Sequence, residues 1–186
     1  MKQLSIMVDM DRCIGCKTCV VACRNHHGLV DHRNDMPGEI PYYIKVESKS
    51  EGTFPDLTED FWVSPCKHCK TAPCATACES GAIRKDKQTG IVLIDKDLCV
   101  GAQKCIEKCP YGVIQFNKAK NYAHKCNMCF DRVIHGQEPV CVEACITDAL
   151  SFGEKEILKM RAEAKGKEIV KKMSSQSIIY VKSATQ

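Results

Sequence analysis

The chain has 186 residues, of which 15 are cysteine, and a formal net charge of +4. A cysteine density this high is typical of a disulfide-bonded secreted domain or of a metal protein. The basic residues are spread among the cysteines and are not gathered with aromatic residues, so a nucleic-acid-binding protein is not favoured.

The N-terminal residues MKQLSIMVDMDRC lack the apolar core of a secretory signal. The wholly apolar runs are only a few residues long, as in IVLI, far below the roughly 20 residues of a membrane-spanning helix. We therefore expect a cytoplasmic protein without a membrane span. In that reducing compartment the cysteines remain thiols and are available as metal ligands.

The first predicted strand, which contains Ile6 and Val8, leads into the first cysteine group, CIGCKTCVVAC, with Cys13, Cys16, Cys19 and Cys23. Residues 24–62 contain NDMPGEIPYY and DLTED and predict a long loop, which is a candidate partner surface. The second group, CKHCKTAPCATAC, follows with Cys66, Cys69, Cys74 and Cys78.

The stretch GAIRKDKQTGIVLID predicts a β-hairpin before the third group, CVGAQKCIEKCP. This group has the spacing of a bacterial ferredoxin loop at Cys99, Cys105 and Cys109, but Ala102 stands where the second cysteine belongs. A second hairpin is predicted in YGVIQFNKAKNYAHKC, and the fourth group follows with Cys126, Cys129, Cys141 and Cys145.

The groups repeat along the chain. Groups one and three align at an offset of 86, which places Asp9 on Asp95 and Cys16 on Ala102, and groups two and four match over CATACESGAI and CVEACITDAL. Strand, cysteine loop, short helix and hairpin predict an α+β fold of ferredoxin-like units of the bacterial two-cluster type. Each unit needs two groups, because the fourth cysteine of one group reaches the other cluster.

Cysteines three residues apart followed by a third cysteine are typical of a loop that wraps three corners of an iron–sulfur cubane. Zinc is the alternative, because its sites also use pairs of cysteines two residues apart, but they rarely add a third cysteine so close. The repeat and the third ligands favour [4Fe-4S] clusters.

The order of the four groups resembles the four-cluster electron-transfer subunits of the dimethyl sulfoxide reductase and polysulfide reductase type, over residues 4–153. The resemblance implies two nested modules. One comprises residues 1–60 plus 110–153 and carries groups one and four, and the inserted module, residues 61–109, carries groups two and three. Residues 154–186 begin with a charged, helix-favouring segment and are expected to form a C-terminal helical tail.

The resemblance also implies the ligand sets. One cluster takes Cys13, Cys16, Cys19 and Cys145; the second takes Cys126, Cys129, Cys141 and Cys23; the third takes Cys66, Cys69, Cys74 and Cys109. Cys78, Cys99 and Cys105 remain for an incomplete fourth site at Ala102. Three states of that site stay open: a [3Fe-4S] cluster, a four-iron cluster with a ligand other than cysteine, or no cluster.

The expected function is electron transfer in anaerobic metabolism, with no substrate chemistry of its own, because the sequence has no dinucleotide, phosphate-loop or hydrolase motif. By resemblance, the partners are a molybdenum- or tungsten-pterin catalytic subunit and a further redox subunit. Since Ala102 alters the family's membrane-side cluster, we expect a soluble complex like that of tungsten-dependent aromatic acyl-CoA reductases. The alternative is an enzyme that uses an open iron at the Ala102 loop as a Lewis acid.

Overall fold

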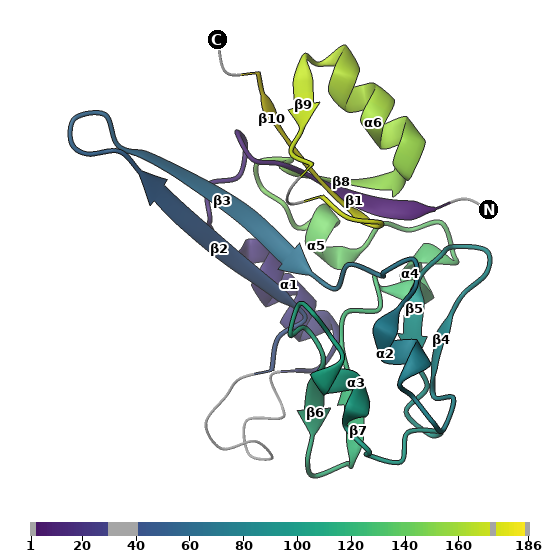
Figure 1. The fold of residues 1–186 in the computed structure, drawn as a ribbon. Coiled ribbons are helices and arrows are strands. Elements are labelled where there is room, and N and C mark those ends of the chain that lie inside the picture. Colours follow the sequence, from purple (N-terminus) through teal and green to yellow (C-terminus); the bar gives the residue numbers. More distant parts are fainter. Residues whose placement is uncertain (1–2, 30–40, 172–173, 185–186) are drawn as a thin grey trace.

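The computed structural model describes residues 3–29, 41–171 and 174–184, which form an α+β structure (Figure 1). The helices are α1 Thr18–His26, α2 Pro73–Thr76, α3 Lys104–Glu107, α4 Phe130–Val133, α5 Val140–Glu143 and α6 Lys155–Ala164. The strands are β1 Leu4–Asp9, β2 Ile44–Glu51, β3 Thr58–Pro65, β4 Ile83–Lys85, β5 Val92–Ile94, β6 Gln115–Asn117, β7 Tyr122–His124, β8 Leu150–Glu154, β9 Lys167–Ile169 and β10 Ile178–Ser183. Within the described ranges, no helix is long and apolar enough to cross a bilayer.

The largest sheet has four strands in the order β8-β1-β10-β9. Strand β1 pairs antiparallel with β8 and parallel with β10. Successive side chains of a strand point to opposite faces, so Ile6 and Val8 pack into the main core with the cysteine loops, whereas Met7 packs against Leu158 of α6. Both faces of β1 are therefore covered, which explains its nearly continuous apolar sequence.

The expectation of a helical tail over residues 154–186 is wrong. Helix α6 ends at Ala164, and β9 and β10 follow. Strand β10 lies inside the sheet between β1 and β9, and its residues Ile178 to Val181 are at most 1% exposed. Four consecutive apolar residues can fill both faces of a buried strand, and they are too few for a helix. The C-terminal segment is thus part of the sheet.

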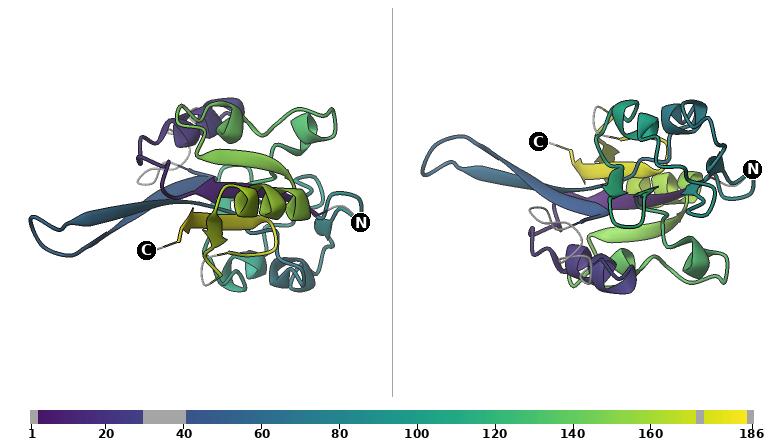
Figure 2. Two further views of the ribbon diagram at one scale, coloured as in Figure 1. Left: turned by 90° about the horizontal axis from the view of Figure 1, so that it is seen from above. Right: turned by 90° about the horizontal axis from the view of Figure 1, so that it is seen from below.

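A long antiparallel hairpin, β2–β3, replaces much of the loop expected between the first two cysteine groups, and it projects from the rest of the molecule (Figures 1 and 2). Its register runs from Ile44 opposite Pro65 to Glu51 opposite Thr58. The Tyr180 hydroxyl in β10 donates a hydrogen bond to the Val63 carbonyl oxygen at 2.7 Å and fixes the base of the hairpin. Residues 30–40, which include part of NDMPGEIPYY, lie outside the described residues.

The two predicted short hairpins are confirmed as β4–β5 and β6–β7. Their apolar residues form a second core cluster in which Ile83 and Val92 meet Ile114 and Ala123. Cys74, Cys78, Cys99, Cys105 and Cys109 belong to the same cluster. The cysteine loops of groups two and three are therefore held together by the hairpins that follow them.

Candidate metal centres

Three cysteines of group one and one cysteine of group four line one cavity, which we call site I: Cys13, Cys16, Cys19 and Cys145. The first three lie on the loop between β1 and α1 and at the start of α1, and the fourth follows α5. Val46 and Val63 of the β2–β3 hairpin complete the lining. Burial, together with the charges of Cys13 and Cys145, raises the pKa of the Cys19 thiol to about 11. The four sulfurs are thus near neighbours.

Site II consists of Cys23, Cys126, Cys129 and Cys141, all of which are buried. Helix α1, which carries Cys23, packs against α5, which carries Cys141, and the loop after β7 brings in the other two. Burial raises the pKa of Cys126 to about 12. Burial also raises the pKa of Cys23, and the charges of Cys126 and Cys129 contribute to that shift. Deprotonation of these thiols needs a compensating positive charge, which bound iron would supply.

Site III is a cavity lined by Cys66, Cys69, Cys74 and Cys109. Burial raises the pKa of Cys69, and the charges of Cys66 and Cys109 add to the shift. The sites adjoin one another. The charge of Cys66 in site III helps to raise the pKa of Cys126 in site II. In the same way, the charge of Cys19 in site I helps to raise the pKa of Cys141 in site II.

Site IV contains Cys78, Cys99 and Cys105, and Ala102 lines the same cavity. The cavity measures about 50 Å³, compared with about 20 Å³ at each of sites I and III. Burial raises the pKa of Cys105, and the charges of Cys78 and Cys99 act in the same direction. The three remaining cysteines of the altered ferredoxin loop are therefore still held together, in a cavity that lacks the fourth sulfur.

The loop of site IV has the same backbone shape as the loop of site I. In site I, Gly15 and Lys17 have φ values of 67° and 61°, and their equivalents Gly101 and Gln103 have φ values of 74° and 57°. Left-handed backbone at a residue other than glycine is uncommon, so the repeated pair is a specific feature. Ala102 thus stands at the same place in its loop as Cys16 does in site I.

Hydroxyl groups lie beside three of the cysteines. The Sγ atoms of Cys16, Cys78 and Cys145 are 3.4, 3.6 and 3.7 Å from the hydroxyls of Thr18, Ser80 and Thr147, respectively. The Thr18 hydroxyl and amide lower the pKa of Cys16. At Cys78, burial alone would raise the pKa of the thiol, but hydrogen bonds from the Ser80 hydroxyl and from the following backbone amides lower that pKa overall. We did not anticipate these hydroxyls, although serine or threonine two residues after a cysteine is a visible signal.

His68 supports the fit of site III to a sulfur-rich group. Its side chain is fully buried, and Nδ1 accepts a hydrogen bond from the Val92 amide at 3.0 Å. A neutral imidazole that accepts at Nδ1 carries its proton on Nε2. Among the described residues, Nε2 has no hydrogen-bond partner, and His68 lines the site III cavity. A cluster sulfur would accept this hydrogen bond, so the buried donor fits an iron–sulfur cluster better than a plain apolar core.

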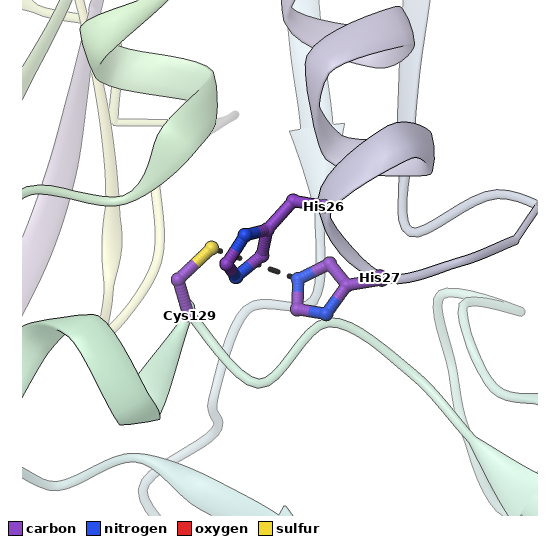
Figure 3. Close-up of side chains that lie close together, drawn as sticks. All are labelled: His26, His27 and Cys129. Atoms are coloured by element: carbon purple, nitrogen blue, oxygen red, sulfur yellow. Dashed lines mark hydrogen bonds between the residues drawn. The ribbon is translucent and has the colours of Figure 1, made fainter.

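His26, His27 and Cys129 also lie close together, with their ligand atoms within 4.8 Å of one another (Figure 3). His27 Nε2 is 3.6 Å from Cys129 Sγ, and His26 Nε2 is 3.6 Å from a carboxylate oxygen of Asp131. Burial lowers the pKa of His27 to about 4, and the charge of His26 contributes, so His27 is neutral at pH 7. Because Cys129 is already part of site II, we interpret His27 as a hydrogen-bond donor to that cysteine.

The structure brings the 15 predicted site cysteines together at these four sites. Ligation itself stays a prediction.

Two family models match the chain. A 4Fe-4S dicluster domain matches residues 57–155, and a 4Fe-4S binding domain matches residues 6–26. Together they cover all four cysteine groups, and the first of them alone covers more than half of the chain.

Curated relatives extend this similarity. The chain is 40% identical to the protein NrfC homolog of Haemophilus influenzae over 82% of this chain and 65% of that protein. It is 35% identical to a polypeptide of the anaerobic dimethyl sulfoxide reductase of Escherichia coli, over 81% of this chain and 73% of the relative. It is 34% identical to YnfG, a probable anaerobic dimethyl sulfoxide reductase polypeptide of the same species, over 86% of this chain and 77% of the relative. The chain therefore spans about two thirds to three quarters of the length of these relatives.

Proposed function

The chain belongs to the family of ferredoxin-type electron-transfer proteins with a 4Fe-4S dicluster domain, and we propose that it relays single electrons between a catalytic oxidoreductase subunit and a second redox partner. One observation carries the proposal: the fold arranges the four cysteine groups as a continuous row of four sites. A [4Fe-4S] cluster, when bound, takes up or releases one electron at a time.

The row has the order I, II, III, IV. Sites I and II adjoin through Cys19 and Cys141, and sites II and III adjoin through Cys126 and Cys66. Sites III and IV are joined by the packed helices α2 and α3, since Cys74 lies in α2 with Cys78 just after it. Electron transfer between clusters falls steeply with distance, so a row of adjoining sites favours a relay over independent metal sites.

We assign [4Fe-4S] clusters to sites I, II and III, each with its four cysteines as ligands. At site IV the states to distinguish are a [3Fe-4S] cluster on Cys78, Cys99 and Cys105, a four-iron cluster with a ligand other than cysteine, and no cluster. We propose the three-iron cluster, because Gln103 keeps the left-handed backbone of its equivalent Lys17 in site I. A loop that no longer bound a cluster would not need this uncommon backbone at a residue other than glycine.

The two-module organisation remains part of the proposal. In this arrangement, residues 1–60 plus 110–153 form one ferredoxin-like module, and residues 61–109 form the inserted one. The second core cluster supports a division into two halves, because it contains Cys74 and Cys109 of site III and the three cysteines of site IV. Cys66 of site III belongs to the main core cluster, so site III lies at the boundary between the halves. These bounds assign the β6–β7 hairpin to the first module, but Phe116 and Ala123 pack in the second core cluster with the inserted residues.

For partners, we propose a molybdenum- or tungsten-pterin catalytic subunit and a further redox subunit in a cytoplasmic complex. Relatives named as parts of dimethyl sulfoxide reductases support a multi-subunit reductase. Co-purification of the native complex identifies the metal of the partner, and recovery of the complex from membranes together with a multi-span protein would contradict the cytoplasmic assignment. The alternative Lewis-acid enzyme is not favoured, because a 4Fe-4S dicluster domain model matches more than half of the chain.

Iron and sulfide analysis with a visible spectrum tests the proposed function. The anaerobically purified chain should be brown and contain about 12 irons for three four-iron clusters, or about 15 with a three-iron cluster at site IV. Stepwise reduction should produce one-electron EPR signals, and an oxidised three-iron signal would locate a cluster at site IV. A colourless protein that contains zinc would overturn the proposal.

A further inference from the structure

Lys125 is a buried cation at the junction of two sites. It lies between β7 and Cys126, and it is 4% exposed. Its Nζ donates hydrogen bonds to the carbonyl oxygens of Val92 and Cys126, the latter at 3.1 Å. An ammonium has three donors, so these two carbonyls account for only part of its capacity.

No carboxylate of the described residues forms an ion pair with Lys125. Burial of a charge without a counter-charge is costly, and buried lysines are normally paired. Two neutral carbonyls offset only part of that cost. The counter-charge for Lys125 must therefore come from another negatively charged group nearby.

Cysteines of two different sites surround Lys125. It lines the site III cavity together with Cys74 and directly precedes Cys126 of site II. Its Nζ is 3.1 Å from the Cys126 carbonyl oxygen, and its side chain lines the cavity that Cys74 lines. The ammonium thus lies beside ligands of both proposed clusters.

On the basis of the proposed function, we infer that Lys125 is the shared counter-charge of the clusters at sites II and III and raises the reduction potential of both. A cluster with four thiolates is anionic, and reduction adds one more negative charge. A fixed positive charge in the protein interior therefore stabilises the reduced state more than the oxidised state. No proton or bond changes in this step; one electron is added to iron.

The proposed clusters at sites II and III, in the middle of the relay, are therefore reduced more readily than they would be without Lys125. Lys85 also lies beside site III, with its Nζ 3.1 Å from the Cys69 carbonyl oxygen. That side chain is only partly buried, so solvent screens its charge more strongly. Lys125 is the cation whose position and burial favour an effect on two clusters.

The test is Lys125→Gln in the complete, cluster-containing chain, because glutamine keeps an N–H donor for the carbonyls and removes the charge. Redox titration followed by EPR should show two clusters, at sites II and III, shifted to more negative potentials. We expect at least a tenfold change in each reduction equilibrium, equivalent to about 59 mV for a one-electron couple. Cys129→Ser and Cys69→Ser variants identify which signals belong to the two sites.

Two further variants serve as controls. Lys155→Gln removes a partly buried lysine whose Nζ also donates to a carbonyl oxygen, that of Ser175 at 2.9 Å, and it should leave all potentials unchanged. Lys125→Arg keeps the positive charge and should give the wild-type reduction potentials. If Lys125→Gln loses the clusters at sites II and III, Lys125→Arg should instead have the wild-type iron content. The inference would be overturned if an iron-replete Lys125→Gln protein kept its reduction potentials, or if the potential shifted at one site alone. It would also be overturned if Lys125→Arg failed to restore the potentials or the iron content. Absence of iron from the wild-type chain would instead reject the proposed function itself.

Discussion

At the scale of single residues, one side chain distinguishes site IV from the three complete cysteine sets. Ala102 lines the cavity with Cys78, Cys99 and Cys105, and the flanking residues keep the φ values of the site I loop. Alanine and cysteine differ by one sulfur atom. Site IV therefore lacks one sulfur atom of a complete set of four cysteine ligands, whereas its loop has backbone angles similar to those of the site I loop.

Ala102→Cys should accordingly create a fourth [4Fe-4S] site. The iron content should rise by about four if the wild-type site holds no cluster, and by about one if it holds three irons. In the second case, the oxidised three-iron EPR signal should disappear. Leu98→Cys adds a thiol to the same loop at a residue that does not line the cavity, and it should leave the iron content unchanged. Unaltered iron and spectra in folded Ala102→Cys would show that the loop geometry does not suit a cluster.

Gly15 is a second residue on which a site depends. Its φ of +67° is left-handed, and a Cβ atom there would lie 2.4 Å from the Phe61 ring. We expect Gly15→Ala to lower the free energy of unfolding by about 3 kcal/mol, combining left-handed backbone strain with overpacking, and to loosen the site I cluster. Gly136→Ala is the control, because Gly136 has a φ of +76° with no atom near a new Cβ, and strain alone costs about 1 kcal/mol. Equal losses in denaturant titrations of the two variants would contradict the role of Phe61.

At the scale of elements, the C-terminal strands close the structure around the first cysteine loop. Lys167 Nζ in β9 lies 3.0 Å from Asp9 Oδ1 and 2.6 Å from Asp11 Oδ2. The Ser183 amide at the end of β10 donates to the same Asp11 oxygen at 2.6 Å. The loop that leads to Cys13 is therefore fixed by residues that lie more than 150 positions later in the chain.

Asp11→Asn should destabilise this closure by about 1–2 kcal/mol, because it removes a charge that accepts hydrogen bonds from Lys167 and Ser183. Burial opposes the shift, but Lys167 and Ser183 hold the pKa of Asp11 below its ordinary value of 3.8. Its contribution is therefore present above pH 3.8 and is lost as the pH falls through the lower folded-state pKa. Asp97→Asn is the matched control from the repeat, because within the described residues the Asp97 side chain forms no hydrogen bond or ion pair like those of Asp11. Equal unfolding midpoints for the two variants at pH 7 would exclude the proposed role.

At the scale of the whole molecule, cysteine side chains are part of the core. The main core cluster contains Cys19, Cys23, Cys66, Cys126 and Cys141 among its buried residues, and the second contains Cys105. A core in which metal ligands take the place of aliphatic side chains depends on the metal for cohesion. Fold and cofactor are thus thermodynamically linked.

Chelation or oxidative loss of the clusters should therefore unfold both halves of the protein. The expected signs are collapse of amide dispersion in NMR spectra and loss of a cooperative thermal transition. Reconstitution with iron and sulfide under reducing conditions should restore both. An apo-protein that retains cooperative unfolding and dispersed amide signals would show that the apolar contacts suffice without metal.

Local features of the protein could be predicted from its amino-acid sequence alone. The cysteine spacing indicated iron–sulfur clusters, and alignment of the repeat placed Ala102 at the position equivalent to Cys16. Turn residues predicted the β4–β5 and β6–β7 hairpins. These features depend on residues a few positions apart, so local preferences suffice to encode them. The hydroxyls that follow Cys16, Cys78 and Cys145 carried a local signal too, but their contact with sulfur became evident only in the structure.

Which distant segments of the chain lie together became evident only from the folded structure. The pairing of β10 with β1 joins Ile178 to Ile6, and no local pattern specifies that partner. The burial of Lys125 and His68 likewise follows from packing between segments, because a lysine or histidine beside a cysteine is solvent-exposed unless another element covers it. Contacts between segments far apart in the chain depend on how all the buried surfaces fit together, and that information is not contained in any one stretch of sequence.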